Sequence, residues 1–207
     1  MGGEDSAPMC CFNPKQNKWS NLGITFNQTD CSVTSFNEEL YVIGGDGSWR
    51  DVKIYNVTLD EWRQVASMET PRAGHSAVVL QEHIYVIAGH DGTACQNSVE
   101  CYNPLTDQWT NISNLSKARR FAGAAAAGGK VVVVGGFGDM TVTTIEPSCE
   151  MFEPSTNQWS LVASPGIPRA ACGIVSIDDT VYLFGGENET SLLSAVECFD
   201  TRKNEMA

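Results

Sequence analysis

Short apolar runs alternate with short polar segments along the chain, and no stretch carries a helical period. In four places two apolar runs follow each other closely with a polar turn between them. The first runs of these four pairs are residues 31–36, 75–80, 122–127 and 172–177. Runs bounded by tight polar turns are typical of central strands that are buried on both faces. A third run then alternates apolar and polar residues, as in Val99-Glu100-Cys101-Tyr102, which indicates a strand with one wetter face.

Three features recur at fixed places within this pattern. A pair of small residues ends the second run: Gly44-Gly45, Ala88-Gly89, Gly135-Gly136 and Gly185-Gly186, with Gly2-Gly3 as the remnant of a further pair. An aromatic residue ends the third run: Phe12, Tyr55, Tyr102, Phe152 and Phe199. A tryptophan lies six residues after the Asn or Glu that follows the aromatic: Trp19, Trp62, Trp109 and Trp159. Met206 takes the tryptophan's place in the last copy.

The second glycines of the pairs are spaced 42, 44, 47 and 50 residues apart, which is expected when the strands are fixed and one loop varies in length. Four antiparallel strands repeated every 40 to 50 residues or so are the sequence signature of a propeller blade. We therefore predict an all-β protein with one repeat domain over residues 1–207. Three repeats are complete, at about 31–64, 75–111 and 122–161, and two are partial, at about 1–20 and 172–207.

Together, the glycine pair, the later aromatic and the tryptophan resemble the kelch repeat, and the resemblance covers essentially the whole chain. The Pro-Arg elements Pro71-Arg72 and Pro168-Arg169, with Ala118-Arg119 as a variant, also match. The resemblance implies a kelch-type β-propeller of four-stranded blades, usually closed by six blades. The repeats here make an incomplete propeller, and a fragment or truncated product is the favoured explanation. A ring closed by these repeats alone is the alternative.

The resemblance implies a module that binds proteins. The segment Glu100–Pro104 is most similar to the kelch domains of BTB-kelch proteins, so we expect the chain to select substrates for a cullin-RING ubiquitin ligase in the cytoplasm. In that family cullin is bound through BTB and BACK segments, which these 207 residues do not contain. An actin-binding or cytoskeletal scaffold is the alternative, and an oxidase or isomerase comes third.

A binding surface is expected on loops, because the strands of a repeat fold are occupied with stacking. The variable loops follow the glycine pairs, at residues 46–50, 90–93, 137–140 and 187–190, and in many kelch adaptors they share one face with the loops between blades. The candidate contacts are Asp46, Trp49, Arg50, His90, Asp91, Arg120, Phe121, Phe137, Asp139 and Met140.

The candidates carry different alternatives. Trp49 is the one tryptophan outside the repeat position, so it is either an interface anchor or packed on its own loop. Arg72, Arg119 and Arg169 recur in register, which favours a structural role, whereas Arg120 and Phe121 break the register and are better candidates for specificity. Kelch proteins that bind acidic degrons place an arginine two residues beyond the recurring one. Those positions hold Gly74, Phe121 and Ala171 here, which argues against a strongly acidic ligand.

Composition narrows the function further. With 13 basic and 25 acidic residues the net charge is −12, which disfavours binding to nucleic acid or to anionic membrane surfaces. No signal peptide or membrane span is visible. The three histidines (His75, His83 and His90) lack the spacing of metal ligands, and no catalytic or nucleotide-binding motif occurs. We therefore expect no enzyme, no cofactor and no bound metal.

Five of the eight cysteines fall at equivalent sites of different repeats: Cys11, Cys101 and Cys198 at one site, and Cys31 and Cys172 at another. Equivalent sites make poor disulfide partners, which favours free thiols in a reducing compartment. Five glycosylation sequons point the other way, at Asn27, Asn56, Asn111, Asn114 and Asn188. We interpret the sequons as accidental, because turns of this fold are rich in Asn, Ser and Thr, and a secreted protein remains the alternative.

Overall fold

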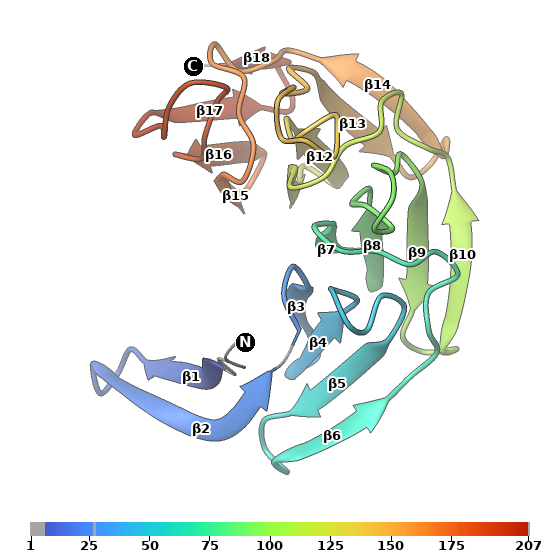
Figure 1. Ribbon diagram of the computed structural model, residues 1–207, viewed down its shortest axis with the longest axis vertical. Coiled ribbons are helices and arrows are strands. Elements are labelled where there is room, and N and C mark those ends of the chain that lie inside the picture. Colours follow the sequence, from blue (N-terminus) through green and yellow to red (C-terminus); the bar gives the residue numbers. More distant parts are fainter. Residues whose placement is uncertain (1–6, 27, 207) are drawn as a thin grey trace.

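The computed structural model describes residues 7–26 and 28–206, with the backbone alone for residues 7–9 and 22–26. The described residues form eighteen β-strands and no helix, arranged as a hairpin and four four-stranded antiparallel sheets. The sheets fan out around a central opening in an open arc (Figure 1). Residues 1–6, which include the predicted remnant Gly2-Gly3, and the sequon residue Asn27 lie outside the described residues.

The strands follow the predicted repeats. The hairpin consists of β1 (Ala7–Asn13) and β2 (Lys18–Phe26). The first sheet consists of β3 (Ser32–Phe36), β4 (Glu39–Ile43), β5 (Val52–Asn56) and β6 (Glu61–Gln64). The second sheet consists of β7 (Ser76–Leu80), β8 (His83–Ile87), β9 (Val99–Asn103) and β10 (Gln108–Ile112). The third sheet consists of β11 (Gly123–Ala127), β12 (Lys130–Val134), β13 (Cys149–Glu153) and β14 (Gln158–Val162). The fourth sheet consists of β15 (Gly173–Ile177), β16 (Thr180–Phe184), β17 (Val196–Asp200) and β18 (Glu205–Met206).

Each sheet is a simple meander in which neighbouring strands are consecutive in sequence. The first strands, β3, β7, β11 and β15, contact one another and line the central opening, and the fourth strands lie at the outer rim (Figure 1). The inner strands enclose a hollow of about 680 Å³. This arrangement confirms the prediction of an all-β, kelch-type propeller arc built from four-stranded blades.

The described part of the last repeat includes the start of its fourth strand, as the sequence pattern predicted. β18 is only two residues long, but it pairs with β17 so that Met206 lies opposite Phe199. In the third sheet Trp159 lies opposite Phe152 in the same way. The structure therefore has four four-stranded sheets, because two residues suffice to begin the outer strand of the last one. Among the described residues, the hairpin supplies the third and fourth strands of its repeat, and the predicted end of a second strand lies outside them.

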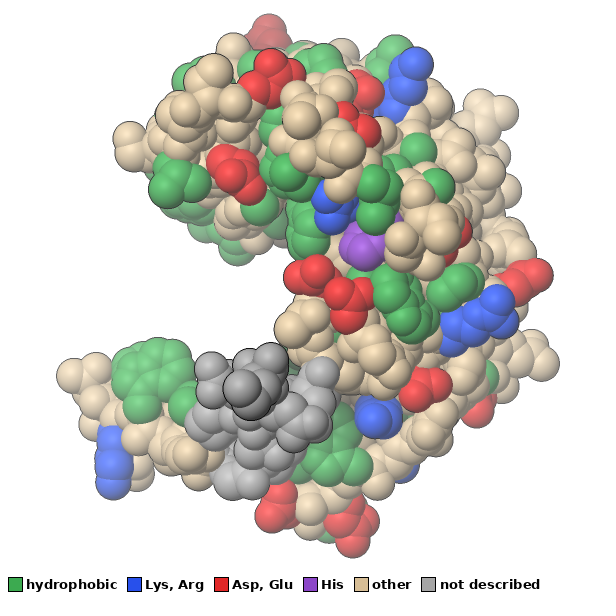
Figure 2. Space-filling view, in the orientation of Figure 1, with side chains coloured by type: hydrophobic (Ala, Val, Ile, Leu, Met, Phe, Trp, Pro, Cys, Tyr) green, Lys and Arg blue, Asp and Glu red, His purple; other side chains and the backbone are tan. Residues whose placement is uncertain are grey.

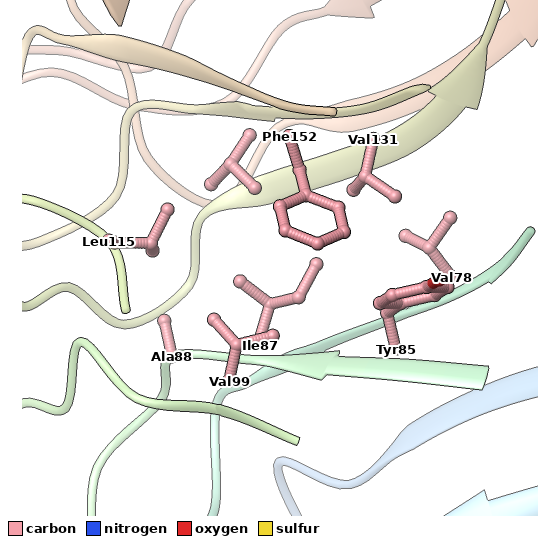
Figure 3. Close-up of a cluster of buried hydrophobic side chains, with 9 residues drawn as sticks. Val78, Tyr85, Ile87, Ala88, Val99, Leu115, Val131 and Phe152 are labelled. Atoms are coloured by element: carbon pink, nitrogen blue, oxygen red, sulfur yellow. The ribbon is translucent and has the colours of Figure 1, made fainter. Parts of the chain in front are cut away.

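The hydrophobic core lies between the sheets. In the cluster between the second and third sheets, Tyr85 and Val78 face Phe152 and Val131, and the ring centroids of Tyr85 and Phe152 are 5.7 Å apart (Figure 3). Tyr102 and Phe199 pack against the preceding sheet in the same way. The neighbouring tryptophan adds a hydrogen bond across the same junction, since Nε1 of Trp159 donates to the backbone oxygen of Ser113 at 2.8 Å. The repeat residues that define the sequence pattern are therefore the packing of the fold.

The outward face of the fourth sheet carries exposed apolar side chains. Ile177, Phe184 and Val196 are 61%, 45% and 57% exposed, and at the other end of the arc Trp19 of the hairpin is 66% exposed. In the internal junctions the equivalents of Phe184 and Val196 are buried against the next sheet. Apolar patches of this kind favour association.

We expect the 207-residue chain to self-associate reversibly through these apolar side chains. The double variant Phe184→Asp/Val196→Asp is expected to stay monomeric up to about tenfold higher concentration, because losing about 1.4 kcal/mol of favourable burial weakens the association about tenfold. Sedimentation velocity over a concentration series measures this. Leu105→Asp is the control, because Leu105 is 80% exposed in an isolated turn. A wild-type chain that stays monomeric throughout would contradict the prediction.

Candidate binding face

Both sets of loops lie on one face of the arc. An isolated β-bridge joins each loop between sheets to the loop after the second strand: Thr29 to Asp46, Ala73 to His90, Arg120 to Phe137, and Ala170 to Glu187. Because the four bridges occupy equivalent positions, the repeat itself brings the two sets of loops together. Figure 2 shows this face, with acidic side chains beside the central opening and a histidine among hydrophobic side chains.

Four of the predicted contact residues form a continuous row across three sheets. The ring centroids of Trp49 and His90 are 5.7 Å apart, those of His90 and Phe121 are 6.4 Å apart, and those of Phe121 and Phe137 are 6.4 Å apart. We call Trp49, His90, Phe121 and Phe137 the aromatic row. His90 and Phe137 are buried, whereas Trp49 and Phe121 are partly exposed. The row therefore offers a firm apolar surface that runs from one blade to the next.

Neither alternative for Trp49 describes its position fully. Its ring packs against the loop of the following sheet, where it contacts His90 edge-on and lies 3.3 Å from the place that a Cβ on Gly92 would occupy. It is therefore packed, but on a neighbouring loop, and it keeps an exposed edge. Arg50 next to it is exposed, and Asp46 on the same loop is half-buried.

Arg120 is held in place by its own surroundings. Its guanidinium lies 5.3 Å from the ring centroid of Phe121 and 6.0 Å from that of Phe137. Nε donates to the backbone oxygen of Asp139 at 3.2 Å, and Nη2 donates to that of Met140 at 3.0 Å. Arg120 thus joins the aromatic row to the tip of the third sheet's loop, and five of the predicted contacts meet at this point.

Two of the acidic candidates, Asp91 and Asp139, have a lowered pKa. Oδ1 of Asp91 accepts hydrogen bonds from the backbone nitrogens of Thr93 and Ala94 and from the Thr93 hydroxyl, and these bonds lower the pKa of Asp91 to about 2. Hydrogen bonds from threonines of its own loop likewise hold the pKa of Asp139 far below its usual range. Burial, with the nearby Arg120 charge, lowers the pKa of His90. The face is therefore acidic at neutral pH.

A second cluster, of buried charged residues, lies beneath the loops, and the sequence pattern predicted only its arginines. The recurring arginines lie in the connections between sheets and are fully buried. Each pairs with a glutamate on the third strand of the sheet that follows it: Arg72 with Glu100, Arg119 with Glu150, and Arg169 with Glu197. The structural role predicted for the arginines fits these contacts, but their glutamate partners were not predicted. These residues hold the loops in place from below and do not present charge to a ligand.

The three histidines occupy separate environments. Nε2 of His75 lies 2.7 Å from the Ser32 hydroxyl in the junction between sheets. Nδ1 of His83, at the start of β8, lies 2.8 Å from the backbone oxygen of Gln81 in the preceding turn. Within residues 7–26 and 28–206 no three His, Cys, Asp or Glu side chains gather in a way that could hold a metal ion. The eight cysteines form no disulfide, and burial raises the pKa of the Cys149 thiol to about 12.

His75 makes the stability of the fold depend on pH. Burial, with the nearby Arg72 charge, lowers its pKa from 6.5 to about 3. Between these values the unfolded chain binds a proton that the folded chain does not, so stability is complete above pH 6.5 and falls as the pH falls. We expect a loss of about 2–3 kcal/mol between pH 7 and pH 4.5 from this residue.

Urea unfolding at several pH values measures this loss. His75→Gln keeps a hydrogen-bonding group near Ser32 but cannot titrate, so its stability is expected to change less over the same interval. His83→Gln is the control, because His83 is only partly buried at the start of β8, away from the junction that holds His75. Equal pH slopes for the wild-type chain and His75→Gln would refute the assignment.

The structure also reveals a hollow that the sequence did not predict. It has a volume of about 390 Å³ and lies between the loops of the third and fourth sheets, lined by Ile145, Pro147, Pro168, Asn188, Glu189 and Thr190. Residues 187–190 were recognised as a variable loop, but the opposite wall was not. The length of the loop that forms this wall was a signal in the sequence. The twelve residues between Gly136 and Cys149 make it the longest loop of this kind in the four repeats.

Comparisons with known proteins place the chain in a class. The family described as the KLHDC2/KLHL20/DRC7 Kelch-repeats domain matches residues 1–186, and the Kelch motif matches residues 168–205. The chain therefore belongs to the family of kelch-repeat domains, whose members are protein-interaction modules.

Individual relatives cover only part of the chain. Kelch-like protein 35 of Mus musculus is 31% identical over 67% of this chain and 24% of its own length. Kelch-like protein 24 of Homo sapiens is 35% identical over 46% of this chain and 16% of its own. Beta-scruin of Limulus polyphemus is 29% identical over 64% and 16%. The chain thus spans a quarter or less of the length of these relatives.

The fold has a similar solved structure. The protein YjhT superimposes with a TM-score of 0.75 at 19% identity, covering 87% of this chain and 63% of the other. At this identity the likeness concerns the fold alone. No helix of the described residues is long and apolar enough to cross a membrane.

Proposed function

We propose that the chain recognises protein substrates for a cullin-RING ubiquitin ligase in the cytoplasm, as the propeller of a BTB-kelch adaptor, and that the loop face holds the substrate. The aromatic row carries this proposal. Aromatic side chains on a rigid scaffold bind with little loss of conformational freedom, and they dominate the energy of protein interfaces. The similarity to Kelch-like proteins 35 and 24 supports the adaptor role.

The row is suited to this task because its members are already in place. Phe137 is fixed by bridges to Arg120 and Ile145, and Arg120 is fixed by its bonds to Asp139 and Met140. Trp49 contributes an exposed edge at one end. A partner that covers this edge would bury a large aromatic surface without having to order the loops first.

Trp49→Ala tests the proposal. We expect this variant to lose most binding to substrates of the ligase, by about tenfold or more, because truncating an aromatic anchor costs 2 kcal/mol or so. Candidate substrates are proteins that the wild-type chain captures from cells and that lose ubiquitin conjugates when the chain is expressed in excess as a competitor. Leu105→Ala is the control, since Leu105 is exposed in a turn on the opposite side.

Thermal unfolding shows whether both variants remain folded. Capture that does not depend on Trp49 would overturn the assignment of the face. Co-sedimentation with actin filaments, without any ubiquitin-linked substrate, would replace the adaptor role by that of a cytoskeletal scaffold.

A further inference from the structure

The hollow beside Ile145 is built from three loops of two sheets. Ile145 and Pro147 come from the loop between β12 and β13, and Pro168 comes from the connection between β14 and β15. The loop between β16 and β17 supplies Asn188, Glu189 and Thr190. Its volume of about 390 Å³ lies within the usual range of ligand pockets, which is about 300–1,000 Å³. The hollow is therefore large enough for at least one side chain of a partner.

The walls of the hollow are fixed before any ligand arrives. Oδ1 of Asn188 accepts hydrogen bonds from the backbone nitrogens of Thr190 at 3.0 Å and Ser191 at 2.9 Å, which closes the turn that carries Glu189. On the other side a β-bridge joins Ile145 to Phe137 of the aromatic row. A pocket of this kind costs little conformational entropy on binding.

The floor and the rim of the hollow differ in chemistry. Ile145 is only 6% exposed and forms an apolar floor, and the exposed Pro147 and Pro168 add apolar surface at its edge. Glu189 lies at the rim, is exposed, and makes no ion pair among the described residues. On the same loop Leu192 is 84% exposed, so the rim also offers apolar surface.

Acidic residues outnumber basic ones around the hollow, although Arg120 lies at the tip of the loop between β12 and β13, where it bonds to the backbone oxygens of Asp139 and Met140. The three loops, residues 137–148, 163–172 and 185–195, contain four acidic residues and one basic residue: Asp139, Glu146, Glu187, Glu189 and Arg169. Arg169 is fully buried and paired with Glu197, so its charge does not offset the others at the surface. Long-range attraction therefore favours a cationic partner and disfavours an acidic one.

We propose that this hollow binds an extended segment of a partner protein that places an apolar side chain on the Ile145 floor and an adjacent lysine or arginine beside Glu189. This inference rests on the proposed function and specifies the chemistry of the segment that the loop face selects. The absence of a basic residue at Gly74, Phe121 and Ala171 agrees with a ligand that is not acidic.

A library of random peptides displayed on phage is the probe, selected on the complete 207-residue chain. We expect the selected peptides to be enriched in lysine or arginine next to an aliphatic residue. The affinity of a synthetic copy, measured by fluorescence anisotropy, is expected to fall about tenfold in Glu189→Lys, as losing one ion pair and gaining a repulsion amounts to 1.4 kcal/mol or so. Raising the salt concentration is expected to weaken binding to the wild-type chain.

Two further variants separate the hollow from the general charge. Thr190→Trp introduces a bulky ring at an exposed rim position and is expected to block the hollow without disturbing the core. Glu82→Lys makes the same charge change as Glu189→Lys at an exposed residue of the turn between β7 and β8, and is expected to change the affinity less than twofold or so. Thermal unfolding of each variant shows whether it is folded.

The outcomes distinguish the two proposals. Selected peptides that are acidic, or that bind equally well to wild-type chain, Glu189→Lys and Thr190→Trp, overturn the inference about the hollow. If such peptides still depend on Trp49, the protein-binding face stands. If the library yields no peptide and no cellular protein is captured through Trp49, both proposals fail.

Discussion

Replacing Glu100 by alanine is expected to lower the free energy of unfolding by about 3–5 kcal/mol, since removing one partner of a buried ion pair leaves an uncompensated charge. Arg72 and Glu100 are 0% and 1% exposed, and their Nη2 and Oε1 atoms are 2.9 Å apart. Burial alone lowers the pKa of Arg72, and Glu100 opposes that effect. The variant would leave the guanidinium in a dry site with only neutral acceptors.

The Glu100 carboxylate also accepts hydrogen bonds from the backbone of the connection between the first and second sheets. Oε2 of Glu100 accepts a hydrogen bond from the nitrogen of Glu69 at 2.7 Å, and Oε1 accepts one from Thr70 at 3.0 Å. Arg72 in turn donates Nη1 to the backbone oxygens of Ala88 and Ser98. Losing Glu100 therefore loosens the connection between the first and second sheets at several points, which adds to the electrostatic cost.

Urea unfolding measures the effect, with Arg63→Ala as the matched control. Arg63 pairs with Glu39 at 2.8 Å, nearly the same distance, but its side chain is 54% exposed. A pair in that position contributes about 0–1 kcal/mol. Similar losses in Glu100→Ala and Arg63→Ala would show that burial does not give the Arg72–Glu100 pair its importance.

The Arg72–Glu100 pair shows which parts of the structure could be predicted from the sequence and which could not. The repeat pattern predicted the strands and the role of the arginines because these depend on short-range periodicity. The pairing of the arginines with glutamates was not predicted, although the first repeat contains a signal for it. In the first sheet Gln28 replaces the arginine and Lys53 replaces the glutamate, so the two positions change together. There the Gln28 Oε1 atom is buried without a hydrogen-bond partner.

The arrangement of the candidate binding face could be predicted only in part, for a similar reason. Loop residues could be chosen because they depart from the repeat, and the row from Trp49 to Phe137 contains four of them. Which of them touch depends on the rotation between neighbouring sheets, and a repeat pattern does not encode that angle. The hollow beside Ile145 depends on the same rotation and on loop length, so the sequence indicated one wall and missed the other.

Replacing Gly89 by alanine is expected to lower the free energy of unfolding by about 2–5 kcal/mol, from 1–2 kcal/mol of backbone strain and a further 1–3 kcal/mol of overpacking. Gly89 has a φ of +91°, and a Cβ there would lie 2.7 Å from the backbone oxygen of Ala73 and 2.8 Å from Cβ of His75. Both neighbours are fixed, since Ala73 is bridged to His90 and His75 immediately precedes β7, the inner strand of the same sheet.

Gly47→Ala is the control that separates the two contributions. Gly47 has a φ of +90°, and a Cβ there would meet no atom within 4 Å, so this variant suffers the backbone strain alone. The difference between the two variants in urea unfolding is therefore the free energy of the clash. Ala88, which precedes Gly89, shows why the distinction matters. It adopts a φ of +61° while fully buried, so a positive φ by itself is tolerated in this fold. Glycine is required at the second position of each pair because the loop between sheets crosses directly above it, and equal losses in Gly89→Ala and Gly47→Ala would contradict this explanation.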